Sequence, residues 1–244
     1  MLGSAVHNNA VWCDAVVRAR GGPTVWADGL WRTEAPAPPY YSNAVTIAAD
    51  QGDAQRRRLR AMLESPLTRP WSVKDGFHVL DLEDLGFRIL FAATWIGMPA
   101  GVPVPVGAAG VSWSAVTNAS GLAGWEVAWS ASNPDGAQRV PPVFGEGLLA
   151  DPDIRFLAGW RGGGIVATAV ANRSDDGSGP VAGISNLVLD DGDRDGLRAG
   201  AVAAARRTFP GLPLVGYERG DDLDAMLRLG FQPVGPLRVW LSPD

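Results

Sequence analysis

A tyrosine and a glutamate, Tyr217 and Glu218, stand at the end of an apolar run that predicts a β-strand over 212–217. A carboxylate accepts a proton from an amine and a phenol donates one, so this pair has the residue types for general acid–base chemistry. The alternative is a surface glutamate beside a half-buried tyrosine. The sequence leaves both interpretations open.

The other reactive side chains are few. Cys13 follows Trp12 in a predicted helix, and we expect it to be a buried structural thiol. With one cysteine and two histidines, His7 and His78, a Cys/His zinc site is not expected. Lys74 is the only lysine among 21 basic residues, which leaves twenty arginines (21 − 1), and we attribute this imbalance to the composition of the source.

Two charged segments resemble binding motifs. The segment 191–196 reads D-G-D-R-D-G and begins like a calcium loop, but the twelfth position is Val202 where a bidentate glutamate belongs. We therefore expect no metal. The segment 56–60, R-R-R-L-R, lies in a predicted helix over 53–64, and we expect a solvated helix face. A phosphate-bearing ligand or an acidic partner is the alternative.

Composition excludes several classes of protein. The chain has 244 residues, 46% of them hydrophobic, which is too apolar for a disordered chain, and its net charge of −5 argues against binding nucleic acid. Residues 89–125 carry no charge, but prolines and glycines interrupt them, so we expect no membrane span. No secretory signal is recognisable, and we expect a cytoplasmic protein. The oligomeric state is left open, a homo-oligomer included.

Short segments recur at a nearly constant distance. Asn43 and Asn186 lie in similar strand-like segments and are 143 positions apart. Leu85-Gly-Phe87 recurs 144 positions later as Leu229-Gly-Phe231, and a tryptophan follows each copy, at Trp95 and Trp240. These matches predict two related halves.

A proline- and glycine-rich segment separates the halves. We assign residues 1–97 to an N-terminal lobe, 98–112 to a linker and 113–244 to a C-terminal lobe. Helices are predicted over 4–20, 53–64, 81–85, 117–130, 195–209 and 221–229. Strands are predicted over 24–32, 43–49, 71–74, 87–96, 154–160, 165–172, 183–189, 212–217 and 231–241. The fold class is α/β, with a mixed, mostly antiparallel sheet flanked by helices in each lobe.

The order of elements in the second half resembles that of the GCN5-related N-acetyltransferase (GNAT) superfamily. The resemblance rests on Gly183–Leu189, on Leu214–Arg219, on Leu229-Gly-Phe231 and on the strand ending at Leu241. The first half resembles a diverged copy, so the whole chain is similar to tandem-GNAT proteins. The resemblance implies an acyltransferase that moves an acyl group from acetyl-CoA, or another acyl-CoA, to a small-molecule or peptide amine.

The resemblance also implies where the cosubstrate binds. Its pantetheine arm is expected along Leu187, Val188 and Leu189, and its pyrophosphate at the start of the next helix, near Gly196 and Arg198. The family's phosphate loop reads Gln/Arg-x-x-Gly-x-Gly/Ala. Residues 193–198 keep only the first glycine and carry several aspartates. The loop is therefore degenerate.

A second departure concerns the catalytic acid. The tyrosine that often stands five positions before the phenylalanine of Leu-Gly-Phe is replaced by Met226 in one half and by Leu82 in the other. Tyr217 and Glu218 are then the nearest titratable residues and the expected catalytic pair. The alternative is a degenerate, non-catalytic pair of lobes that binds a ligand or a protein.

Overall fold

All strands belong to one sheet. The computed structural model describes residues 1–131 and 142–244, and its eleven strands follow the order β1-β2-β3-β4-β11-β5-β10-β9-β8-β7-β6. The strands are β1 (Val25–Ala27), β2 (Leu30–Arg32), β3 (Ala44–Thr46), β4 (Ser72–Asp75), β5 (Arg88–Met98), β6 (Ser112–Ala115), β7 (Ile154–Arg161), β8 (Gly164–Asp175), β9 (Pro180–Leu189), β10 (Leu214–Glu218) and β11 (Gln232–Leu241). Among the strand pairs of the described ranges, only β3–β4 and β9–β10 are parallel.

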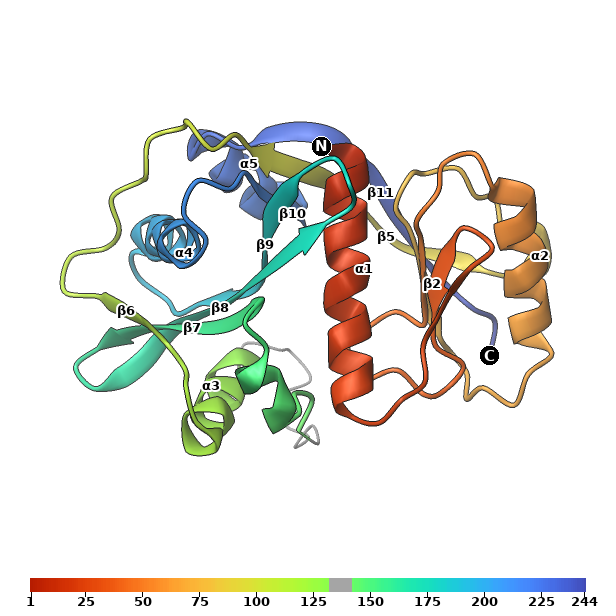
Figure 1. The fold of residues 1–244 in the computed structure, drawn as a ribbon, viewed down its shortest axis with the longest axis horizontal. Coiled ribbons are helices and arrows are strands. Elements are labelled where there is room, and N and C mark those ends of the chain that lie inside the picture. Colours follow the sequence, from red (N-terminus) through yellow and green to blue (C-terminus); the bar gives the residue numbers. More distant parts are fainter. Residues whose placement is uncertain (132–141) are drawn as a thin grey trace.

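Helices cover both faces of the sheet (Figure 1). They are α1 (Leu2–Ala19), α2 (Gly52–Leu63), α3 (Ala119–Ala131), α4 (Arg194–Thr208) and α5 (Gly220–Arg228), with short 3-10 helices η1 (Glu83–Leu85) and η2 (Glu146–Ala150). Helices α1 and α3 pack on one face, and α2, α4 and α5 pack on the other. None of the helices in the described ranges is long and apolar enough to span a membrane.

The long strands β5 and β11 form the centre of the sheet. They pair antiparallel along most of their length, from Gln232 opposite Gly97 to Leu241 opposite Arg88. On its other side β11 pairs with β4, and β5 pairs with β10. The last strand of each half of the sequence therefore lies beside the next-to-last strand of the other half, and the sheet is continuous across the two halves.

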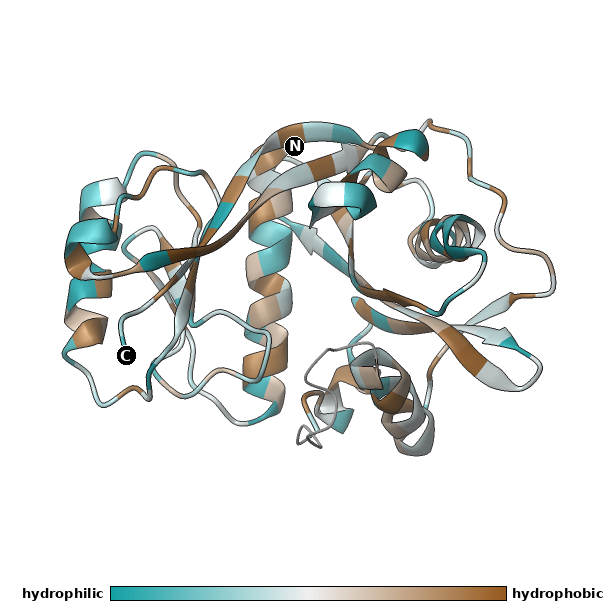
Figure 2. Ribbon diagram, turned by 180° about the vertical axis from the view of Figure 1, so that it is seen from behind, coloured by the Kyte–Doolittle hydropathy of each residue, from teal (hydrophilic) through white to brown (hydrophobic). Residues whose placement is uncertain are grey.

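Alternating side chains of the strands divide the core into layers. On β4, Val73 packs with α2, while its neighbour Lys74 points to the α1 face. On β10, Leu214 packs with α4 and Val215 packs with α1. In Figure 2 the helices α1 and α2 alternate hydrophobic and hydrophilic colour along their length, as helices with one buried side do.

Most of the predicted elements are present. The α/β class and the mixed, mostly antiparallel sheet are confirmed. The prediction of a separate sheet for each lobe was wrong, because all described strands belong to one sheet. Three details were wrong. The predicted strand over 24–32 is a hairpin that turns at Asp28 and Gly29, and strand β6 was not predicted. The helix predicted to begin at Thr117 is capped one residue later, by Asn118, whose Oδ1 accepts the N–H of Gly121 (2.8 Å).

The close contact of α1 with β9 requires a glycine. A Cβ on Gly183 would lie 1.9 Å from Oδ1 of Asn8 and 2.6 Å from Oδ1 of Asn172. We expect Gly183→Ala to lower the free energy of unfolding by about 1–3 kcal/mol, because the buried Asn8 side chain must move and give up its hydrogen bonds to Asn172 and Ser174. Denaturant unfolding of Gly183→Ala and of the control Gly124→Ala measures this. Gly124 is exposed in α3 with open space around it, and its alanine variant should be at least as stable as the wild type. Equal stability of the two variants would contradict the prediction.

Candidate active site

The parallel strands β9 and β10 separate shortly after they meet. They pair only at Ala182 with Leu214 and at Gly183 with Val215. Beyond these pairs the edge of β9 from Ile184 to Leu189 has no strand beside it, so its peptide groups face an opening in the sheet. Gly216 lies at the narrow end of this opening, where a Cβ would lie 3.0 Å from the carbonyl oxygen of Ile184.

A β-bulge shapes the free edge of β9. Asn186 has a left-handed backbone (φ 52°), and the pairing with β8 shifts at this point. Its side chain is held in place, because Oδ1 accepts hydrogen bonds from Trp12 Nε1 (3.1 Å) and Ser185 Oγ (3.0 Å), and Nδ2 donates to the hydroxyl of Tyr41 (3.3 Å). The bulge therefore has a fixed geometry that reaches from β9 to α1.

A cavity of about 330 Å³ lies between α1 and this opening. Its size is that of a small-molecule site. Helix α1 contributes Asn8, Asn9, Trp12 and Cys13, strand β9 contributes residues 184–188, and strand β10 contributes residues 215–218. Lys74, Trp95, Tyr40, Tyr41, Trp129 and Asn172 complete most of the wall. The lining thus combines aromatic surface with amide groups and a few ionisable side chains.

Glu218 is the carboxylate of this cavity. Burial raises its pKa to about 7, and the negative charge of Asp222 acts in the same direction, while Arg198 opposes both. A carboxyl group with a pKa near 7 is deprotonated in part at neutral pH and can exchange a proton there. Tyr217 precedes it on β10, so their side chains leave opposite faces of the strand, and both residues line the cavity.

Lys74 enters the cavity from the other half of the sheet. It is 6% exposed, and its Nζ donates to Asn9 Oδ1 (2.7 Å) and lies 3.5 Å from the hydroxyl of Tyr217. The ammonium also lies over the Tyr217 ring, 4.6 Å from its centroid. No described carboxylate lies within 4.0 Å of it, so its contacts are with neutral groups.

Cys13 is a buried thiol, as expected, but it lies in the wall of the cavity. Burial raises the pKa of the thiol, and the charge of Lys74 offsets only part of that effect. The thiol is therefore neutral at physiological pH, which does not favour a nucleophile.

No family model and no curated protein matches the sequence. Among solved structures, a GCN5-related N-acetyltransferase from Kribbella flavida is 19% identical, with a TM-score of 0.63 over 98% of this chain and 96% of that one. A conserved protein of unknown function from Staphylococcus epidermidis is 14% identical (TM-score 0.64, 91% and 94% covered). A GNAT-family protein from Novosphingobium aromaticivorans is 16% identical (TM-score 0.54, 94% and 97% covered).

The chain has a GNAT-like fold. In this fold the positions assigned to the cosubstrate divide into two groups. Leu187 and Val188 line the cavity on the free edge of β9, whereas Leu189 is buried beyond it and packs with Leu197 of α4. The strand positions therefore remain candidates for holding an extended ligand.

The helix positions already have partners within the chain. The N–H of Gly196 donates to Oδ1 of Asp193 (2.9 Å), which caps α4. Arg198 is 4% exposed and forms ion pairs with Asp195 (3.2 Å) and Asp222. An incoming phosphate at this end of α4 would have to displace carboxylates that hold the same groups.

The corresponding place in the N-terminal half is closed. Strands β3 and β4 also pair in parallel, but beyond them the N–H of Gly76 donates to Thr46 Oγ1 (2.8 Å), and Asp75 is buried with its carboxylate accepting the N–H groups of Val79 and Leu80 (both 3.0 Å). No opening like that between β9 and β10 forms here.

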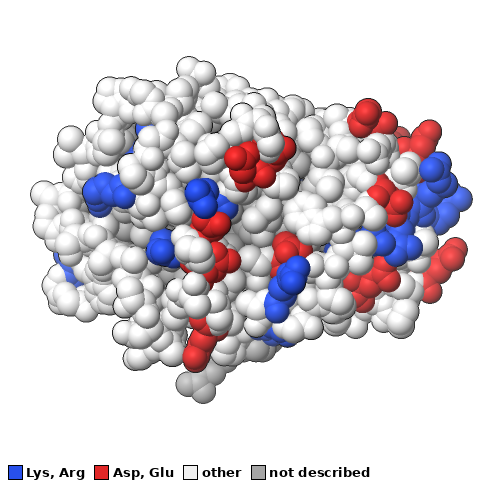
Figure 3. Space-filling view, viewed as in Figure 1, with Lys and Arg blue, Asp and Glu red and all other residues white. Residues whose placement is uncertain are grey.

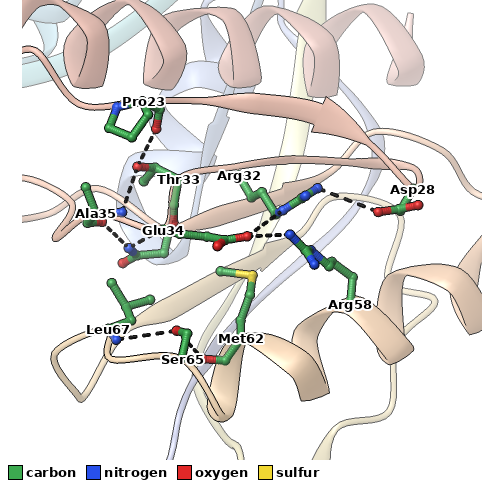
Figure 4. Close-up of polar contacts among 11 residues, drawn as sticks. Pro23, Asp28, Arg32, Thr33, Glu34, Ala35, Arg58, Met62, Ser65 and Leu67 are labelled. Atoms are coloured by element: carbon green, nitrogen blue, oxygen red, sulfur yellow. Dashed lines mark hydrogen bonds and ion pairs between the residues drawn. The ribbon is translucent and has the colours of Figure 1, made fainter.

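Two arginines of the basic run on α2 form ion pairs with carboxylates of the chain. Arg58 pairs with Glu34, which in turn accepts from the buried Arg32 (3.2 Å), and Arg32 lies 3.7 Å from Asp28 (Figure 4). Arg56 pairs with Asp84. Figure 3 shows basic and acidic side chains side by side at the end of the molecule that carries α2. These arginines have partners on the surface, in agreement with the solvated face that we expected.

The sequence did not identify Lys74 as a site residue. One signal was its rarity, which we assigned to composition. The repeat offset held a further clue, because Lys74-Asp75 stands 143 positions before Tyr217-Glu218, the same distance that separates Asn43 from Asn186.

The raised pKa of Glu218 predicts a pH dependence of stability. The folded protein binds the Glu218 proton more tightly than the unfolded chain, so this residue's contribution to the free energy of unfolding falls as the pH rises from about 4.5 to about 7 and stays low above that. Relative to Glu218→Gln, the wild type should lose on the order of 2 kcal/mol between pH 5.5 and 8.5. Denaturant unfolding across this range tests it, and a constant difference between the two proteins would contradict it.

Proposed function

We propose that this protein is an acyl-CoA-dependent N-acyltransferase whose reaction takes place in the opening between β9 and β10. The observation that carries the proposal is the meeting of three features at one place: a free strand edge, a cavity of about 330 Å³ and a carboxyl group with a pKa of about 7. A GNAT-like fold alone would not carry it, because one fold hosts many functions.

The free edge of β9 would hold the acyl-CoA. Peptide groups of Leu187 and Val188 would pair with the amides of the pantetheine arm as a neighbouring strand does. The degenerate loop before α4 offers little to the phosphates, since its aspartates cap the helix and pair with Arg198. We therefore expect the strand edge and the cavity to supply most of the affinity for acetyl-CoA or another acyl-CoA.

The cavity would hold the amine, and the transfer would be direct. The carboxylate of Glu218 takes a proton from the ammonium of the acceptor, and the free amine attacks the thioester carbonyl. A C–N bond forms and the C–S bond breaks, while the second amine proton leaves to water. Tyr217 lines the same cavity and would donate its phenolic proton to the departing thiolate, and the phenolate would then take a proton back from water.

We further propose that the two halves of the chain descend from one ancestral lobe and have exchanged their last strands. Strands β2–β4 and β8–β10 pair in the same order and with the same directions, and β5 and β11 occupy equivalent places on opposite sides of the centre. The proposed boundaries remain residues 1–97 and 113–244. A cytoplasmic, freely diffusing enzyme is the setting that we propose.

The second candidate is a binding module that transfers nothing. It is favoured by the start of α4, where Asp193 occupies the N–H of Gly196 and acidic residues surround the position of the phosphates. Such a protein would keep the cavity and its ligand and would not bind acyl-CoA.

Binding and turnover distinguish the two candidates. We expect acetyl-CoA, propionyl-CoA or myristoyl-CoA to bind in a calorimetric titration, and thiol release to occur when an amine is added. Glu218→Gln should lower kcat by about 10²- to 10⁴-fold, which is the usual contribution of a general base, while acyl-CoA binding is retained. Rates with the wild type should rise with pH through about 7.

A matched control removes a carboxylate far from the cavity. Glu64 is exposed at the end of α2, and Glu64→Gln should retain wild-type kinetics. Absence of binding by all three acyl-CoAs at millimolar concentration would overturn the enzyme proposal in favour of the binding module.

A further inference from the structure

The least explained charge in the described structure is that of Lys74. The residue is buried, with 6% of its surface exposed, yet the partners of its ammonium are the amide oxygen of Asn9, the hydroxyl of Tyr217 and the ring of the same tyrosine. A buried charge is costly unless an opposite charge lies beside it. The ammonium lines a cavity, so a ligand can supply that charge.

The charged groups around this cavity are held apart. Cys13 is the nearest thiol and is neutral, because burial raises its pKa. Asp75 follows Lys74 in β4 but binds the N–H groups of Val79 and Leu80. Glu218 lines the same cavity and forms no ion pair with Lys74 within 4.0 Å. The wall thus presents one cation and one carboxyl group at separate places.

From this arrangement we infer that the cavity binds a small amino acid–like molecule, whose carboxylate pairs with Lys74 and whose amine lies toward Glu218. The inference rests on the proposed function in one respect, that this molecule is the acyl acceptor. Its body would contact aromatic surface, which Trp12, Tyr41 and Trp95 provide. An apolar or aromatic amino carboxylate fits these three requirements together.

The test compares molecules that differ only in the carboxylate. The probes are phenylalanine with phenethylamine, tyrosine with tyramine, tryptophan with tryptamine, leucine with isopentylamine, and histidine with histamine, each titrated into the full chain by calorimetry at pH 7.5. We expect at least one carboxylate-bearing member to bind at least about tenfold more tightly than its decarboxylated partner, as a charged hydrogen bond allows.

Two substitutions assign this preference to Lys74. Lys74→Met removes the charge and keeps an apolar stem, and it should abolish the preference for the carboxylate. Asn9→Asp keeps the lysine but places a carboxylate 2.7 Å from its ammonium, at the position of the present amide oxygen. This variant should also lose the preference, while its melting temperature rises. Each variant relieves a buried charge that lacks an opposite partner, so neither should be less stable than the wild type, and a shared loss of binding is not explained by unfolding.

The outcomes separate this inference from the function on which it rests. If no probe pair shows a preference that depends on Lys74, the inference is overturned, whatever acyl-CoA does. If acyl transfer proceeds equally well to the decarboxylated amines and is unchanged in Lys74→Met, the enzyme proposal stands and the inference is wrong. If amino carboxylates bind through Lys74 but no acyl-CoA binds, the inference stands for a binding module and the enzyme proposal fails.

Discussion

The antiparallel pairing of β5 with β11 is the constraint on which the rest of the structure depends. These two strands join halves of the sheet that would otherwise share no hydrogen-bonded edge. Each continues beyond its outer neighbour, since β4 pairs with β11 only from Arg238 onward. Pro233 and Pro236 lie in the part of β11 that β4 does not reach, where a missing N–H costs no bond on that side. The prolines and the register shift after Pro233 are therefore compatible with a central strand.

This arrangement also creates the candidate site. Strand β10 pairs with β5 on one side and lies next to the opening toward β9 on the other. The cavity at this opening is covered by α1. Lys74 and Tyr217 leave β4 and β10 on the same face and meet above the two central strands. A buried ammonium from one half and a carboxyl group of raised pKa from the other thus share one cavity. Neither half could form this site alone.

Much of the fold was predictable because its signals are local. Apolar periodicity located α2, α4 and α5, the Leu-Gly-Phe segments marked the start of the last strands, and prolines and glycines located the segment after β5. Glu218 and Tyr217 were found as titratable residues at a strand end.

The pairing of β4 with β11 was not predictable, because equivalent strands of two similar halves have similar patterns and either pairing satisfies them. Lys74 was missed for the same reason, since it reaches the site only through that exchange. The hydrogen bond of Gly196 to Asp193 and the ion pairs of Arg198 depend on side-chain rotamers, which the spacing of residues in the sequence does not reveal.

The order of the strands along the chain has a consequence during synthesis. Strands β4 and β5 are synthesised before β11, the strand that separates them in the sheet, because β11 is the last of the eleven strands along the chain. Until it arrives, each of the two earlier strands exposes an unpaired edge to which any other extended segment can attach. Pairing of these edges with β11 therefore completes the sheet only after the rest of the chain has been made.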